Sequence, residues 1–238
     1  MEAAKTSIVE HLLTIPEAQV RIFDLKWQST FYTVFHQTKT SKLLHTLCMA
    51  PIVFSLFALA SYINFSDAAL ISSLASVTAV NGALVVLIIS AIWYLLMDVT
   101  IGLMTIPIIV AFWILANTFS TYLGTNGIYI ALGMLFLFSF IQTVSHQPEP
   151  VPPPHSGSKN FVAYKKWMKI SSIGQKVKVF VLFPVFTCVE LISSPRLLPV
   201  QVLRLMHRFG FRKEFEKETT ALAKRVLKSG DYNAYFNS

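Results

Sequence analysis

A long internal stretch of the sequence carries almost no charge, and this limits the possible folds more than any other feature. Between Leu43 and Pro148 the acidic or basic side chains are those of Asp67 and Asp98, and neither Lys nor Arg occurs. A charge at the centre of a membrane-spanning helix costs about 2.5–3.5 kcal/mol on insertion scales. Charged residues make up 13% of the chain, against about 25% in soluble domains. We therefore predict a polytopic membrane protein.

Apolar runs of about 20 residues, the length that crosses a bilayer, occur four times in this stretch. The predicted spans cover residues 42–63, 69–97, 102–116 and 128–144. The residues between the third and fourth spans include Ser, Thr and Gly, and we interpret them as a loop. Short connections favour antiparallel neighbours, so we expect an all-α membrane protein built on a bundle of four transmembrane helices.

The basic residues lie at the two ends of the chain. Five Lys or Arg residues precede Leu43, and the other 15 follow Glu149. The positive-inside rule then places both ends in the cytoplasm or in an organelle matrix, as an even number of spans requires. We divide the chain into four regions: a cytoplasmic N-terminal helical segment (1–41), the four-span bundle (42–146), a Pro-rich linker (147–158) and a basic interfacial or re-entrant C-terminal region (159–238).

Two segments of the C-terminal region are predicted to lie at the membrane surface. Residues 179–189 are apolar but are interrupted by Pro184, and they are too short for a span, so we expect an interfacial or re-entrant helix. Residues 200–228 form a basic amphipathic stretch. This stretch either lies on an anionic membrane surface or packs against a partner as a solvated helix.

Three histidines and one carboxylate are expected at the same membrane level. His45 lies at the start of the first span, His146 at the end of the fourth and Asp98 at the end of the second. His36 precedes His45 by nine residues, which would place the two on opposite faces of one straight helix. A polar break with Ser41 as the predicted N-cap permits a helix–turn–helix that folds His36 back beside His45. Imidazole and carboxylate groups suit Fe(II) or Zn(II), so all four are candidate metal ligands, with ordinary interfacial side chains as the alternative.

Three segments of the sequence resemble motifs of the fungal and plant 2-hydroxy fatty acid dioxygenases. The first is Phe-Tyr-Thr-Val-Phe-His at residues 31–36, followed by His45 and Pro51. The second is Phe-Ile-Gln-Thr-Val-Ser-His at residues 140–146, and the third is Leu-Phe-Pro-Val-Phe at residues 182–186, followed by Glu190. Asp98 and Gly102 also resemble an Asp…Gly pair of some members. The resemblance covers roughly residues 31–212, with the motifs in the family's order.

This resemblance implies a small multi-span protein of the endoplasmic reticulum that carries out Fe(II)-dependent α-oxidation. A 2-hydroxy fatty acid would lose its carboxyl carbon and become an acid one carbon shorter. His36, His45 and His146 match the family's histidines and would be metal ligands, with Asp98 as a candidate fourth ligand. Lys42 or a nearby basic side chain is a candidate for holding the carboxylate. The implied partners are membrane lipids and a fatty acyl substrate, and no nucleic acid is expected.

Departures from the family's motifs keep a second function open. Thr-Lys-Thr-Ser at residues 38–41 stands where the family usually has Asn-Pro-x-Asn, and Ser145 stands where it has Gly. Pro150 replaces a Glu, with Glu149 one position early. The alternative is a non-catalytic relative that serves as a structural or accessory subunit of a larger membrane complex, with the mitochondrial inner membrane as its location. Retention of all three histidines favours the enzyme.

Overall fold

Apolar helices form the centre of the molecule. The computed structural model describes residues 21–69, 78–145, 149–150 and 194–229. Its elements in chain order are α2 (Leu25–Phe35), α3 (Lys39–Ser61), β1 (Asn64–Ala69), β2 (Ala79–Asn81), α4 (Gly82–Met97), α5 (Val99–Leu123), α6 (Asn126–Ser145) and α9 (Lys213–Ser229). Residues 194–208 are also helical, and we call them the 194–208 helix.

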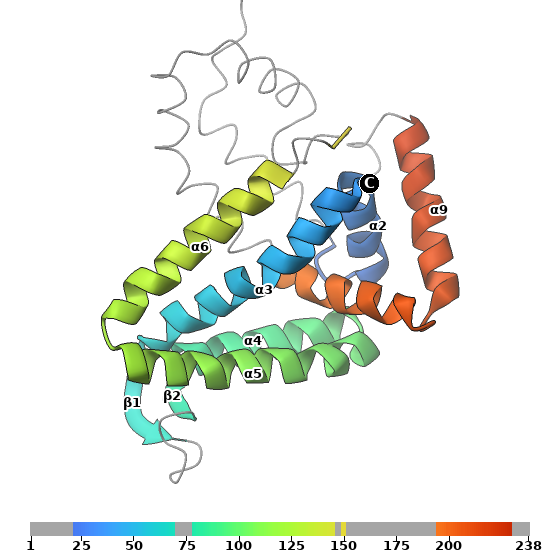
Figure 1. Cartoon of the computed structure of the whole chain (residues 1–238). Coiled ribbons are helices and arrows are strands. Elements are labelled where there is room, and N and C mark those ends of the chain that lie inside the picture. The colour runs from blue at the N-terminus through green and yellow to red at the C-terminus, as the bar shows by residue number, and fades with distance from the viewer. Residues whose placement is uncertain (1–20, 70–77, 146–148, 151–193, 230–238) are drawn as a thin grey trace, which may run out of the picture.

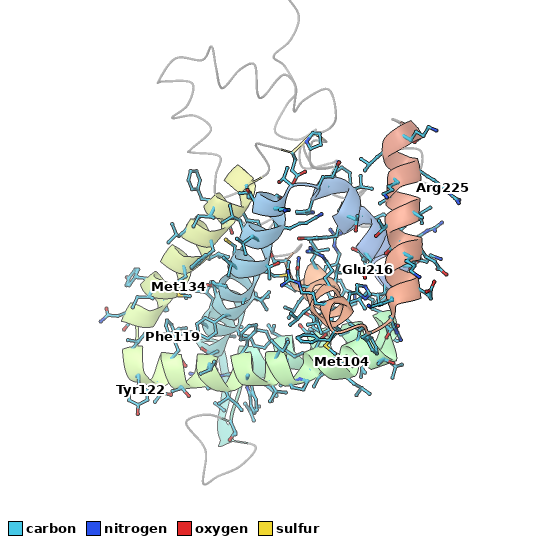
Figure 2. All side chains as sticks on the ribbon, turned by 45° about the vertical axis from the view of Figure 1, so that its right-hand side comes forward. Met104, Phe119, Tyr122, Met134, Glu216 and Arg225 are labelled. Carbon is cyan, nitrogen blue, oxygen red and sulfur yellow. The ribbon has the colours of Figure 1, made fainter. Side chains whose placement is uncertain are left out.

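The helices α4 and α5 lie side by side, and α3 contacts both of them as well as α6 (Figure 1). Gly102 allows the close approach of α5 to α4, because a Cβ atom there would lie 2.7 Å from the Tyr94 carbonyl oxygen. The 194–208 helix packs on this core through buried side chains such as Leu203. The Tyr94 hydroxyl group also donates a hydrogen bond of 2.8 Å to the carbonyl oxygen of Pro195. At the far end of α5, Tyr122 projects away from the protein (Figure 2).

The predicted spans correspond to helices, but their ends differ from the prediction. The first span is α3, the fourth is α6, and the third extends as α5 through residues 117–123, which we had expected to form a loop. Within the described residues, α3 and α5 are long and apolar enough to cross a membrane, whereas α4 and the apolar part of α6 are shorter. The described part of the chain is therefore mostly helical and contains two candidate membrane-spanning helices.

The predicted second span, residues 69–97, differs from the structure at its described early residues, because Ala69 lies in β1 and residues 79–81 form β2. The helix α4 begins at Gly82, and Asn81 is its N-cap, with a side-chain oxygen that accepts a hydrogen bond of 3.0 Å from the Ala83 N–H. Asn is a strong N-cap residue and a poor one inside helices, which explains why the helix starts there. Gly82 also permits contact with α3, because a Cβ atom at this position would lie 2.5 Å from the Ala60 carbonyl oxygen.

A two-stranded antiparallel hairpin precedes α4, which an all-α prediction did not include. The strands β1 and β2 pair with Asn64 opposite Asn81 and Ala69 opposite Ala79. The Asn81 side-chain amide donates a hydrogen bond of 2.7 Å to the Asn117 side-chain oxygen on α5. This buried amide pair fixes the base of the hairpin to the helices.

The basic stretch predicted over residues 200–228 consists of two helices rather than one. The chain turns between the 194–208 helix and α9 with Gly210 at φ 89° and Arg212 at φ 48°. Positive φ values end a right-handed helix, and glycine adopts them at little cost. The segment 179–189, the linker 151–158 and His146 lie outside the described residues.

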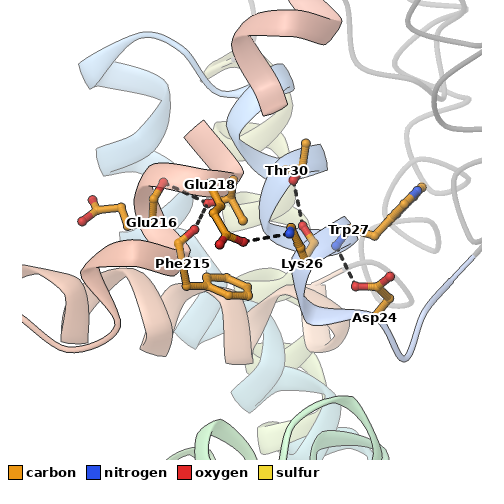
Figure 3. A network of polar contacts seen from close by, with 8 residues as sticks. Asp24, Lys26, Trp27, Thr30, Phe215, Glu216 and Glu218 are labelled. Atoms are coloured by element: carbon orange, nitrogen blue, oxygen red, sulfur yellow. Dashed lines mark hydrogen bonds and ion pairs between the residues drawn. The ribbon is translucent and has the colours of Figure 1, made fainter. Parts of the chain in front are cut away.

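The helix α9 packs on α2, so its apolar face is covered by the chain itself. Trp27 of α2 belongs to a buried cluster with Val226 of α9. Asp24 caps α2 by accepting a hydrogen bond of 2.9 Å from the Trp27 N–H, and Lys26 forms an ion pair of 2.8 Å with Glu218 (Figure 3). Residues 200–228 were predicted either to lie on a membrane surface or to pack against a partner. The helix α9 packs against a partner, which is α2 of the same chain.

Candidate functional site

His36 and His45 meet at the turn between α2 and α3. His36 is the C-cap residue of α2, and α3 begins at Lys39. The centroids of the two imidazole rings are 4.0 Å apart with an interplanar angle of 79°. The side chains are buried, with His36 4% exposed and His45 2% exposed. The expected fold-back of His36 is confirmed, but Thr38 rather than Ser41 is the N-cap of α3 and accepts a hydrogen bond of 3.2 Å from the Ser41 N–H.

Hydrogen bonds orient both imidazoles. The Nδ1 atom of His36 lies 2.9 Å from the Tyr32 carbonyl oxygen. A carbonyl oxygen accepts only, so Nδ1–H is the donor and Nε2 keeps its lone pair. The Nδ1 atom of His45 lies 2.8 Å from the Gln142 amide nitrogen, and the Gln142 amide oxygen is buried without a hydrogen-bond partner in the described part of the chain. A half-turn of this amide would place its oxygen on His45 Nδ1–H and leave the lone pair on Nε2.

Glu149, which follows α6 in the chain, also contacts the α2–α3 turn. Its carboxylate is 1% exposed and accepts hydrogen bonds from the Gln37 N–H (2.8 Å), the Thr38 N–H (3.0 Å) and the Thr38 hydroxyl group (2.8 Å). A negative charge at this position satisfies the free N–H groups at the start of α3 and interacts favourably with the helix dipole. Gln142 and Glu149 lie on either side of His146 in the chain; Gln142 contacts His45 in α3, and Glu149 contacts the α2–α3 turn.

A row of side chains that the sequence analysis did not connect extends from the histidine pair. The Tyr32 ring lies parallel to the His36 ring, with centroids 4.0 Å apart and an interplanar angle of 6°. The guanidinium carbon of Arg204 lies 4.4 Å from the centroid of the Tyr32 ring. Burial raises the pKa of the Tyr32 hydroxyl group, and the nearby positive charge of Arg204 opposes that rise. Arg204 resembles every other basic residue of an amphipathic helix in the sequence, so no local signal distinguishes it.

Asp98 lies apart from the histidine pair, at the turn between α4 and α5. Its Oδ1 atom accepts a hydrogen bond of 2.9 Å from the Ile101 N–H, and its Oδ2 atom accepts one of 2.6 Å from Arg212. No group of three or more His, Cys, Asp or Glu residues within the described ranges is arranged to hold a metal ion. The structure therefore does not bring Asp98 to His36 and His45, and Asp98 instead caps α5 and pairs with Arg212.

The ion pair of Asp98 predicts a pH-dependent contribution to stability. Burial by itself raises the pKa of this carboxyl group, but the hydrogen bond and charge of Arg212 and the backbone N–H groups of Ile101 and Thr100 hold the pKa below its usual value. A carboxyl group with a lowered folded-state pKa stabilises the fold above its unfolded pKa of about 3.9, and this stability is lost as the pH falls through the folded value.

We expect Asp98→Asn to lower the free energy of unfolding by about 1 kcal/mol near pH 7, after allowance for solvent screening. Asparagine can still cap α5, so the lost energy is that of the charge. The difference from the wild type should shrink as the pH falls below about 4, as measured by chemical denaturation in detergent micelles. The exposed Glu214, paired with Lys217, provides the matched control Glu214→Gln. A difference for Asp98→Asn that stays constant with pH would contradict this interpretation.

Comparison with known proteins found no matching family model, no similar curated protein and no similar solved structure. Function is therefore inferred from the described residues at and beside the α2–α3 turn, which are His36, His45, Gln142 and Glu149.

Proposed function

We propose that this protein is a membrane-embedded Fe(II)-dependent dioxygenase that shortens 2-hydroxy fatty acids by one carbon. The observation that carries the proposal is the buried contact between His36 and His45, whose ring centroids are 4.0 Å apart. Both histidines belong to the motif that resembles this enzyme family. The length and apolar composition of α3 and α5 support membrane insertion. The proposal retains four spans, both termini on the cytoplasmic side and the endoplasmic reticulum as the location.

The side chains of the turn fit an iron ion. Imidazole is a ligand for Fe(II), and metal-bound histidines usually bond a second group through the other ring nitrogen. His36 and His45 both have such a bond at Nδ1, to Tyr32 and Gln142 respectively. We propose His146 as the third ligand, because Glu149, three residues later, is bonded to the same turn. Bound iron would supply the oxygen chemistry of the reaction.

The protein's own contribution is to hold the acid where apolar and polar surfaces meet. Leu43 and Leu47 lie one turn apart on the same face of α3, the face away from His45, and are 59% and 58% exposed. An acyl chain beside this face would stay in the lipid while its polar end reaches the turn. Because the two histidines are themselves buried, water has little access to the reacting end.

The experiment that tests this proposal combines metal analysis with turnover. The full chain, purified from membranes in mild detergent, should contain about one iron per chain and convert 2-hydroxypalmitic acid into an acid one carbon shorter. A chelator should abolish turnover, and Fe(II) should restore it while Zn(II) should not. Absence of both iron and turnover, after Fe(II) has been added back, would reject the enzyme.

An accessory subunit is the second candidate, and the bonding of Glu149 favours it. Three hydrogen bonds from residues 37 and 38 to this carboxylate fix the start of α3. A polar cluster of this kind can serve to join helices rather than to bind a ligand. Under this alternative the protein purifies with other chains of a membrane complex, as native mass spectrometry would show, and metal-free protein keeps its full thermal stability.

A further inference from the structure

We propose that Arg204, assisted by Lys42, binds the carboxylate group of the fatty acyl substrate and sets a preference for free acids over esters. The inference rests on the proposed function, because it assigns the residue that recognises the substrate of that site. Its basis is the charge and the position of both side chains, together with the contact of Arg204 with the Tyr32 ring.

Arg204 has the properties of an anion-binding residue. Among the described residues, no carboxylate lies within ion-pair distance of its guanidinium group, whereas Arg212 on the same segment is bonded to Asp98. One donor of Arg204 is used in a 3.2 Å hydrogen bond to the Gln201 side-chain oxygen. A guanidinium group has five N–H donors in a planar fork that matches a carboxylate. The cation–π contact with the Tyr32 ring, 4.4 Å from the guanidinium carbon to the ring centroid, restrains this group.

The position of Arg204 suits recognition of an acid whose reacting carbon is next to the carboxyl group. Tyr32 has His36 stacked on its ring and Arg204 over the same ring. The His36 ring and the Arg204 guanidinium group each lie so close to the centre of the Tyr32 ring that one face cannot hold both. They therefore lie on opposite faces of the Tyr32 ring. In a 2-hydroxy acid the hydroxyl-bearing carbon adjoins the carboxyl carbon. The Tyr32 ring therefore lies between Arg204 and His36, and a carboxylate held at the edge of the Arg204 guanidinium group is about one ring thickness away from the histidine turn.

Lys42 adds a second positive charge beside the first. It lies in the first turn of α3, close enough to Arg204 for the two charges to repel each other. Thr46, one turn later, donates a hydrogen bond of 3.1 Å to the Gln201 side chain and so joins α3 to the 194–208 helix. The neighbouring carboxylate of Glu149 is bonded to the start of α3. The Glu149 carboxylate also acts on Lys42 and balances one of the two positive charges, so the remaining positive charge favours an anion from outside the chain.

Equilibrium binding to metal-free protein tests this inference. The full chain is reconstituted in nanodiscs of phosphatidylcholine, and binding of labelled 2-hydroxypalmitic acid is compared with binding of its methyl ester. We expect the wild type to prefer the acid. Arg204→Gln should weaken acid binding about 10- to 100-fold, the effect of losing a charged hydrogen-bonded pair, and should leave ester binding unchanged. Arg204→Lys should restore the preference for the acid in part. Lys42→Gln should weaken binding of the acid less than Arg204→Gln does.

Arg208→Gln is the matched control, because Arg208 lies one turn further along the same helix and is exposed. We expect this variant to bind the acid within about twofold of the wild type, as surface charge changes have small effects. An unchanged preference for the acid in Arg204→Gln would overturn the inference. Because binding is measured without iron, selective binding without turnover would reject the oxidation but not the role of Arg204.

Chemical labelling of the wild type covers the case in which Arg204→Gln does not fold. Phenylglyoxal modifies accessible arginines, and peptide mass spectrometry locates the modified residues. We expect 2-hydroxypalmitic acid to protect Arg204 but not Arg208, and the methyl ester to protect neither. Equal labelling of Arg204 with and without the acid would overturn the inference. Equal protection by lysophosphatidic acid would also overturn it, because the site would then recognise anionic lipid head groups in general.

Discussion

Under the proposed function, replacement of His45 by alanine is expected to prevent iron binding and to abolish turnover of 2-hydroxy fatty acids. His45 is buried, contacts the His36 ring and is bonded to Gln142. Loss of an outer partner of a metal ligand costs about 10- to 100-fold in metal affinity or activity. We therefore expect a loss of that size for Gln142→Leu and a loss of more than about 100-fold for His45→Ala. Plasma mass spectrometry measures the iron, and gas chromatography measures the shortened acid.

The stability of the same variants separates a metal centre from a structural polar cluster. If His45 serves to bind metal, His45→Leu combined with Gln142→Leu should leave the metal-free protein about as stable as the wild type, because both partners of their buried hydrogen bond are then replaced by apolar groups. Added Fe(II) should raise the thermal midpoint of the wild type and not that of the variant. His207→Ala is the control, since the His207 imidazole bonds the Phe211 carbonyl oxygen away from the pair. A loss above about 2 kcal/mol in the metal-free double variant, without any effect of Fe(II) on the wild type, would contradict the metal centre.

The apolar pattern of the sequence predicts where α3, α5 and α6 lie but not where they end. Hydropathy counts polar residues such as Asn117 and Ser120 against a span, so the third span was expected to stop before them. In the structure the Asn117 side chain accepts a hydrogen bond from Asn81 and is buried within α5. A partner 36 positions away in the sequence thus offsets the cost of the buried amide. The β1–β2 hairpin was missed for the same reason, since Asn64 and Asn81 are joined by pairing across the chain.

The candidate site shows the same division between local and distant information. The contact between His36 and His45 was predictable because a polar break between two apolar segments permits a short turn. The position of Glu149 was not, because its bonds to Thr38 join residues 111 positions apart. Asp98 illustrates the opposite error. A carboxylate at the correct membrane level was expected among the histidines, but the start of α5 and the charge of Arg212 hold it elsewhere.

Removal of the Glu149 carboxylate is expected to lower the free energy of unfolding more than Asp98→Asn or a change at His45. Glu149→Ala leaves the Gln37 N–H, the Thr38 N–H and the Thr38 hydroxyl group without their acceptor. Each buried donor without a partner costs about 1–3 kcal/mol, and entry of water recovers part of this. We expect the free energy of unfolding to fall by about 3–5 kcal/mol. Thermal and chemical denaturation in micelles measure this loss.

The location of the damage tests the structural explanation more sharply than its size. Glu149→Gln keeps one acceptor oxygen but turns an N–H₂ group toward one of the donors, so we expect about half the loss found for Glu149→Ala. In both variants the Gln37 and Thr38 amides should exchange hydrogen faster, because their acceptor at the start of α3 is weakened or gone. Glu214→Gln, at an exposed ion pair, should change stability by less than about 0.5 kcal/mol and leave this exchange as it is. Unchanged protection of the Gln37 and Thr38 amides in Glu149→Ala would show that the carboxylate does not hold the α2–α3 turn. Glu149 would then not connect the end of α6 to the histidine pair.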